Sequence, residues 1–62
     1  MYILQNQTNQ KYVALDSTVR GNEFGFTDNK KKAARFYNKF NAIVFREYIK
    51  NNTGENCTIL NT

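Results

Sequence analysis

The feature that most constrains this chain is that no internal cross-link can hold it together. Its 62 residues include one cysteine, Cys57, and no histidine. An intrachain disulfide is therefore impossible, and we expect Cys57 to be a partly buried thiol in a short strand. A domain of this size buries only about 60% of its unfolded surface. One domain, residues 1–62, must be held by packing alone, and nine aromatic residues supply much of the surface available for burial.

Short runs of β-favouring residues predict a small sheet. Residues 2–4 and 12–15 flank a polar stretch, which indicates a β-hairpin. Phe24 and Phe26 are two residues apart, so in an extended chain their side chains point the same way. We therefore expect a third short strand over residues 23–26, with both rings facing the core.

The connections and the last strand are also marked in the sequence. A closing strand is predicted over residues 57–60, and Gly54 is expected to adopt a positive φ in the loop before it. The segment between the second and third strands contains the turn-forming residues Asp16, Ser17, Gly21 and Asn22. Gly25, within the third strand, indicates a bulge or a close approach of the backbone.

Residues 29–40 have the spacing of an amphipathic helix. Apolar side chains recur at i, i+3, i+4 and i+7, at positions Ala33, Phe36, Tyr37 and Phe40. This pattern predicts a helix whose apolar side, including all three rings, packs on the core. Thr27 and Asp28 are suitable residues to cap its N-terminus.

The next segment, residues 42–50, fits two interpretations. As a helix begun by Asn41, it would place Ala42, Phe45 and Ile49 on one face. As a strand, it would form a second hairpin with the loop that follows. We expect the helix, because a short loop then returns the chain to the last strand. The predicted fold is α+β, a small antiparallel sheet in the order ββ(β)ααβ with helices packed on one face.

Charge is concentrated in the middle of the chain. The net charge is +4, yet residues 29–46 hold six cations and no acid. On a helix over 29–40, Lys31, Arg35 and Lys39 would form a stripe at i, i+4 and i+8. Lys32 would widen this stripe and Arg46 would extend it. The candidate binding residues are therefore Lys31, Lys32, Arg35, Lys39 and Arg46.

Three interpretations of this basic stripe remain open. It can be the solvated outer face of an ordinary core helix, which any surface helix shows. It can contact several phosphates of a nucleic acid. It can also dock on an acidic protein surface.

The remaining composition argues against several classes of protein. The five acids are scattered and histidine is absent, so we expect no enzyme, no catalytic residues, no metal site and no cofactor. No stretch is apolar enough to span a membrane, and the first residues do not have the pattern of a signal peptide. These observations predict a cytoplasmic protein, either a monomer or a homodimer.

Three stretches of the chain, "YILQNQTNQKYVA", "FGFTDNKKKAARF" and "AIVFREYIKNN", share a pattern with a known group of proteins. The matching positions are Tyr2, Lys11, Tyr12, Phe26, Thr27, Asp28, Ala33 and Phe36. By these residues, most of the chain resembles small phage and prophage proteins of Gram-positive bacteria. The stretch "NAIVF" departs from the group, where a more acidic stretch is usual. Proteins of this kind that are understood tend to bind and redirect or inhibit host machinery.

Two functional hypotheses follow. The resemblance implies a small non-catalytic protein of phage or mobile-element type, which binds a host or defence protein stoichiometrically inside the host cell. The alternative is a direct nucleic-acid-binding module that uses the basic residues of 29–40. The aromatic residues, expected in the core, favour the first hypothesis.

Overall fold

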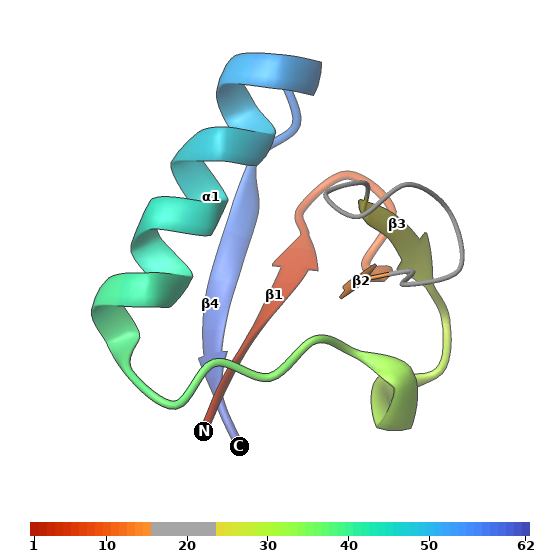
Figure 1. The fold of residues 1–62 in the computed structure, drawn as a ribbon. Helices are drawn as coiled ribbons and strands as arrows, with labels where there is room; N and C mark the ends of the chain where they lie inside the picture. The colour runs from red at the N-terminus through yellow and green to blue at the C-terminus, as the bar shows by residue number, and fades with distance from the viewer. Residues whose placement is uncertain (16–23) are drawn as a thin grey trace.

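The computed structural model describes residues 1–15 and 24–62 and has the expected α+β architecture (Figure 1). Four antiparallel strands form one sheet in the order β3-β2-β1-β4, with one α-helix, α1, lying against it. The strands are β1 (Tyr2–Asn6), β2 (Tyr12–Leu15), β3 (Phe24–Thr27) and β4 (Cys57–Asn61). The two helical elements are a 3-10 turn, η1 (Lys30–Lys32), and α1 (Lys39–Thr53).

The predicted strands all form. β3 ends one residue later than expected, and Glu23 and the turn formers between residues 16 and 22 lie outside the described residues. Phe24 and Phe26 both pack against the core cluster, with their ring centroids 5.9 Å apart in an edge-to-face arrangement. The prediction that both rings face the core is therefore confirmed.

The turn between β1 and β2 is fixed by a buried amide. Asn6 is fully buried, and its Oδ1 accepts a hydrogen bond from the Thr8 N–H at 2.8 Å. Its Nδ2 donates to Oε2 of Glu55 at 3.0 Å, which ties the hairpin to the segment before β4. Because this amide has partners on both sides, its burial is not penalised by a lost hydrogen bond.

The predicted helix over residues 29–40 does not form. Only η1 is helical, and the chain then runs extended between β1 and β2 (Figure 1). The Ala34 N–H donates to the Val13 carbonyl of β2 at 2.9 Å. Phe36 exchanges both main-chain hydrogen bonds with Tyr2 of β1, each at 2.8 Å.

These bonds explain why helical spacing did not produce a helix. β1 and β2 pair only through Gln5 and Tyr12. At the start of β1, the main-chain groups of Tyr2 that β2 leaves unpaired therefore bond with Phe36. Sheet-type bonds to two strands thus replace the bonds of the helix. Three lysines at its first turn would also have opposed the helix dipole.

α1 confirms the helical interpretation of residues 42–50, but it is longer than predicted. Asn38, not Asn41, is the N-cap, and its Oδ1 accepts from the Asn41 N–H at 3.2 Å. Gly54 ends the helix with φ 77°, the left-handed conformation expected of it. Thr27 and Asp28, the caps predicted for a helix over residues 29–40, do not cap η1, because Asn29 is its N-cap.

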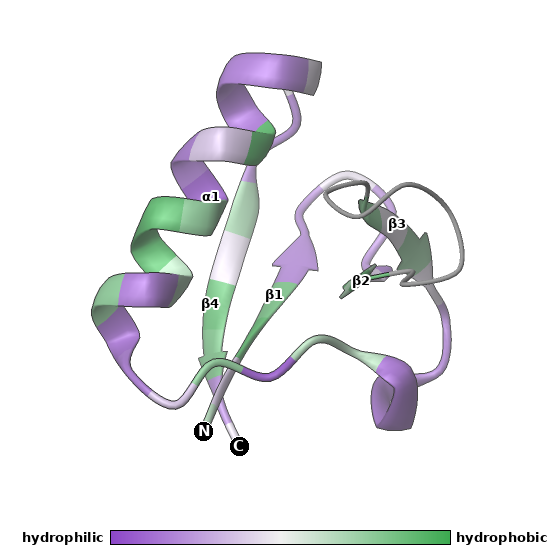
Figure 2. Cartoon of the chain, in the orientation of Figure 1, coloured by the Kyte–Doolittle hydropathy of each residue, from purple (hydrophilic) through white to green (hydrophobic). Residues whose placement is uncertain are grey.

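The core lies between α1 and one face of the sheet. Ala42 and Ile49 of α1 pack in one cluster with Leu4, Val13 and Cys57. Figure 2 shows hydrophobic colour on parts of all four strands and hydrophilic colour on η1. Ala42 and Ile49 are two of the residues predicted to share the core-facing side of this helix. The free cysteine, Cys57, is buried, with 4% of its surface exposed.

A candidate binding surface at the basic turn

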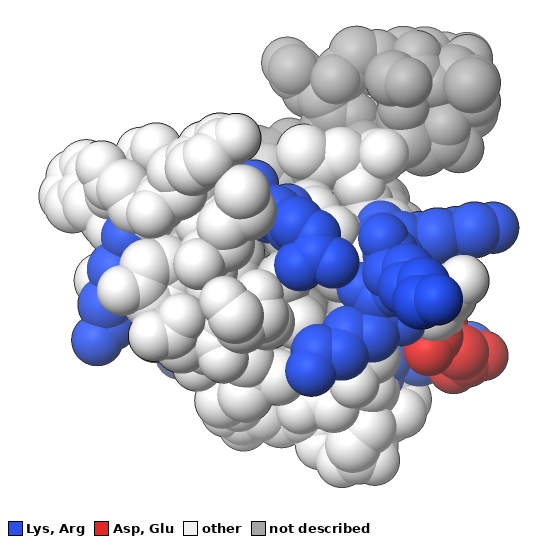
Figure 3. Space-filling view, turned by 90° about the horizontal axis from the view of Figure 1, so that it is seen from below, with Lys and Arg blue, Asp and Glu red and all other residues white. Residues whose placement is uncertain are grey.

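The most concentrated charge lies on η1 and the extended segment after it. Four cations follow one another closely in the chain, Lys30, Lys31, Lys32 and Arg35, and all four are exposed. The Asn29 side chain holds the turn by accepting from the Lys31 N–H at 2.9 Å. In Figure 3 Lys and Arg side chains gather at the end of the molecule where the termini lie. We call these four residues the basic turn.

Within the described residues, no carboxylate of an acidic side chain lies within ion-pair distance of the basic turn. The one acidic–basic side-chain pair found there joins Arg46 and Glu47 of α1, with Nη2 and Oε1 3.6 Å apart. Unpaired cations close together create a positive potential that attracts an anionic partner. As far as the described residues go, the basic turn is therefore available for binding without an ion pair being broken.

A shallow hollow of about 670 Å³ opens beside the basic turn. It is lined by Lys30, Lys31 and Arg35 together with Met1 and Thr62. Arg35 is held there by a long hydrogen bond, in which Nη1 donates to Oγ1 of Thr62 at 3.4 Å. At this hollow the basic turn lies beside Thr62, the residue that follows β4, a proximity that the sequence did not indicate.

Two aromatic side chains predicted for the core are exposed instead. Tyr37 is 82% exposed and Phe40 is 68% exposed. Phe36, in contrast, is half-buried, and its ring centroid lies 5.6 Å from that of Phe45 with the ring planes tilted by 41°. Tyr37 precedes the N-cap of α1, and Phe40 lies on the side of its first turn away from the core. The expectation that all three rings face inward is wrong for Tyr37 and Phe40.

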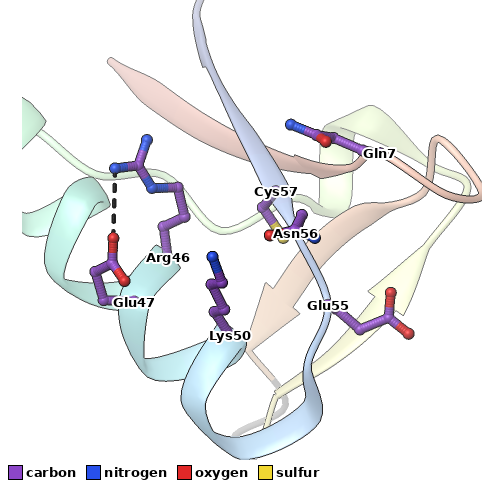
Figure 4. Close-up of a pocket in the computed structure, with 7 residues that line it drawn as sticks. All are labelled: Gln7, Arg46, Glu47, Lys50, Glu55, Asn56 and Cys57. Atoms are coloured by element: carbon purple, nitrogen blue, oxygen red, sulfur yellow. Dashed lines mark ion pairs between the residues drawn. The ribbon is translucent and has the colours of Figure 1, made fainter.

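The remaining predicted binding residues are distributed differently from the helical stripe. Lys39 is exposed as the first residue of α1. Arg46 is half-buried and lines a second hollow, of about 230 Å³, at the start of β4 (Figure 4). Lys50 lines this hollow as well. Lys31 and Arg35 both line the first hollow, but they do so from η1 and from the extended segment after it, not from one face of a helix.

Figure 4 shows how the second hollow is built. Arg46, Glu47 and Lys50 reach it from α1, while Gln7 and Glu55 lie on the other side of β4. Sequence reasoning missed Lys30 and Lys50 as members of the two hollows. The i, i+4 spacing of Arg46 and Lys50 on one helix was the available signal for Lys50.

The Cys57 thiol borders this second hollow but is not activated. Burial raises the pKa of the thiol, and the negative charge of Glu55 raises it further, while Arg46 lowers it in part. The protonated, unreactive form is therefore favoured over the thiolate that a nucleophile requires.

The raised pKa predicts a stability that falls in alkaline solution. Above about pH 8.5 the unfolded chain loses the thiol proton while the native protein retains it, so the free energy of unfolding decreases as pH rises. Cys57→Ala should lack this contribution. Urea unfolding of both proteins at neutral and alkaline pH measures the difference, which isolates the contribution of the thiol. An equal loss of stability in both proteins would contradict the assignment.

Comparison with known proteins adds no relative to these observations. Among the described residues, no helix is long and apolar enough to cross a membrane, and no three metal-ligating side chains lie together. No protein-family profile, no curated protein and no solved structure matches the chain.

Proposed function

We propose that this protein is a small non-catalytic binding protein, which docks on an anionic surface of a partner protein and acts stoichiometrically. The observation that carries the proposal is the basic turn, four exposed cations with no acidic side chain paired to them among the described residues. Opposite charge on a partner would accelerate association and fix its orientation.

The composition around the basic turn suits a protein partner. Arg35 borders the hollow, and the exposed rings of Tyr37 and Phe40 lie close by in the chain. Arginine and tyrosine are over-represented among the residues that contribute most binding energy at protein interfaces. A shallow hollow bordered by cations, with exposed rings near it in the chain, can therefore bind a protein without a deep pocket.

The resemblance to small phage and prophage proteins supplies the biological setting of the proposal. In that setting the partner is a host or defence protein in the cytoplasm of the host cell, and binding inhibits or redirects it. The partner's surface is expected to be acidic, because the basic turn would otherwise face charge of its own sign.

Direct binding of nucleic acid is the second candidate, and the exposed rings favour it. Lysines that contact phosphates release counterions, and exposed rings such as Tyr37 and Phe40 can stack on unpaired bases. The earlier argument against this function, that the rings are buried, does not hold for these two residues.

Affinity capture from a lysate of a Gram-positive host, with and without nuclease treatment, separates the two functions. The immobilised wild type is expected to retain one acidic protein at near-equal molar amount in both lysates. The variant Lys30→Glu/Lys31→Glu/Arg35→Glu, which reverses the three cations that line the hollow, should lose it. Asn52→Glu, which adds a negative charge at the exposed C-terminal end of α1, far from η1 in Figure 1, should keep it.

Fluorescence anisotropy with single- and double-stranded DNA and RNA completes the test. Binding by the wild type that weakens with salt at a logarithmic slope of about −2 to −4, and is lost in the triple variant, would establish nucleic-acid binding instead. Retention of the acidic protein by the folded triple variant would refute a role for the basic turn. Circular dichroism of each variant controls for folding.

A further inference from the structure

α1 carries apolar side chains on two sides, and only one of these sides packs on the sheet. Ala42 and Ile49 are fully buried in the core cluster. Phe40, Val44 and Tyr48 are instead exposed, at 68%, 51% and 43%. A helix at the surface of a domain normally turns polar residues to solvent on the side opposite its core face. Among the described residues, nothing covers this second apolar side fully.

The three exposed side chains form one ridge along the helix, which we call the apolar ridge. They stand at i, i+4 and i+8, and side chains four residues apart on a helix lie one above the other. On a wheel of about 100° per residue, Ala42 and Ile49 lie about 140–160° away from Val44, the centre of the ridge. The ridge thus points away from the core, and Figure 2 shows hydrophobic colour on the middle turns of α1.

The apolar ridge is symmetric about its centre. One aromatic ring stands four residues before Val44 and another stands four residues after it. An antiparallel second copy, related by a two-fold axis at Val44, would place Phe40 beside Tyr48 of the other copy. Ridges of this i±4 type interdigitate when two helices cross at about −50°, the commonest class of helix packing. The ridge therefore fits a second copy of itself.

The charges beside the apolar ridge also fit a second copy. Lys39 and Glu47 lie in one i±4 row, on the same flank of the ridge. In the antiparallel pair, Lys39 falls about 3 Å along the axis from Glu47 of the other copy, within reach of two long side chains. Glu47 lies 3.6 Å from Arg46 of its own chain, but an exposed pair of this kind is weak and leaves the carboxylate available.

This pairing would compensate an unfavourable charge at the start of α1. The first turn contains no acidic residue and begins with a cation, Lys39. The helix dipole opposes a positive charge there, and Glu47 of the other copy would bring a negative charge to that end. The other cations of α1, Arg46 and Lys50, border the second hollow beside β4, so neither faces the ridge of the other copy.

The area of the apolar ridge indicates how strong such a pair would be. Because an aromatic side chain offers about 150–250 Å², the exposed parts of the three side chains amount to about 300 Å² per copy. With the polar neighbours of the ridge, two copies would bury about 1,000 Å², the lower limit for a specific interface. We therefore expect a weak dimer, with a Kd of about 10–100 μM.

We propose that the apolar ridge of α1 is a homodimer interface, in which two copies pack antiparallel about Val44 and Lys39 of each copy pairs with Glu47 of the other. An acidic partner protein is a poorer occupant, because the ridge itself carries no cation.

The proposed dimer leaves the basic turn of each copy free. η1, which carries three of its four cations, lies apart from α1 in Figure 1. Phe40 is then covered by the second copy, whereas Tyr37 precedes α1 and stays outside the ridge. The inference thus goes beyond the proposed function and does not depend on it.

Sedimentation equilibrium of the wild type from about 5 to about 500 μM, a range that brackets the expected Kd, tests the dimer. The mass is expected to rise from 7.3 kDa towards twice that value. Val44→Glu places two carboxylates at the two-fold axis and should raise the Kd at least about tenfold. Leu15→Glu is the matched control, the same kind of replacement at 53% exposure on β2, and should dimerise as the wild type does. Circular dichroism controls for folding.

Exchange of the two charges tests the antiparallel orientation. Lys39→Glu and Glu47→Lys each bring like charges together in their own homodimers, and each should raise the Kd about threefold or more. An equimolar mixture of the two variants should dimerise as strongly as the wild type. In the mixed pair both contacts are again opposite in sign, and the total charge equals that of two wild-type copies.

Each other result has a defined meaning. A wild type that stays monomeric up to about 500 μM, or a Val44→Glu variant that dimerises like the wild type, would refute this interface. A mixture that does not recover would refute the antiparallel pairing of Lys39 with Glu47. If a monomeric wild type captures the acidic protein and only Val44→Glu loses it, the ridge is a docking surface for that partner and the proposal is overturned. If Val44→Glu is monomeric and still captures the protein, the dimer interface is supported and the proposed function stands separately.

Discussion

Leu4→Ala is expected to lower the free energy of unfolding by about 2–5 kcal/mol, the range found when a fully buried Leu is truncated. Leu4 is 0% exposed and packs in the cluster that joins α1 to the sheet. A domain of this length has about 3–9 kcal/mol of total stability. The variant should therefore lose roughly half of the total stability and unfold at a clearly lower urea concentration than the wild type.

Urea unfolding followed by circular dichroism measures this effect. Leu15→Ala is the matched control, because Leu15 lies at the end of β2 with 53% exposure and should change stability by less than about 0.5 kcal/mol. If Leu4→Ala does not fold at all, Leu4→Met, with an expected change below about 1.5 kcal/mol, keeps the position measurable. Equal effects at positions 4 and 15 would contradict the described core.

Phe36→Ala is expected to lower the free energy of unfolding by about 2–3 kcal/mol, somewhat less than for a fully buried Phe. The half-buried ring packs beside Phe45, and the residue joins the segment after η1 to β1. Tyr37→Ala and Phe40→Ala should each change stability by less than about 0.5 kcal/mol, because both rings are exposed.

These three variants distinguish the described fold from a helix over residues 29–40. In that helix all three rings would share the core face, so all three substitutions would be costly. Amide exchange provides an independent measurement. Protection typical of a helix should begin only after Asn38, within α1, with separate protection at Ala34 and Phe36 from their bonds to the strands.

The sequence alone identified most residues of the basic turn, but not how they are arranged in space. The run of cations identified Lys31, Lys32 and Arg35, because a charge imbalance is visible without a structure. The sequence did not indicate that the residues lie on a turn beside the end of β4, or that Arg46 and Lys50 border a separate hollow. Those placements depend on contacts between distant parts of the chain.

Local patterns alone determined the strands and the hairpin, because side-chain spacing and turn residues within a few positions agree with one another there. For residues 42–50 they left helix and strand open, and the packing of Ala42 and Ile49 on the sheet decided for the helix. Only the tertiary structure decided the conformation of residues 29–40, where the helical spacing of the apolar residues is a coincidence. Main-chain groups left open on β1 and β2 bind Phe36 and Ala34, and these bonds outweigh a helical tendency that three adjacent lysines already weaken.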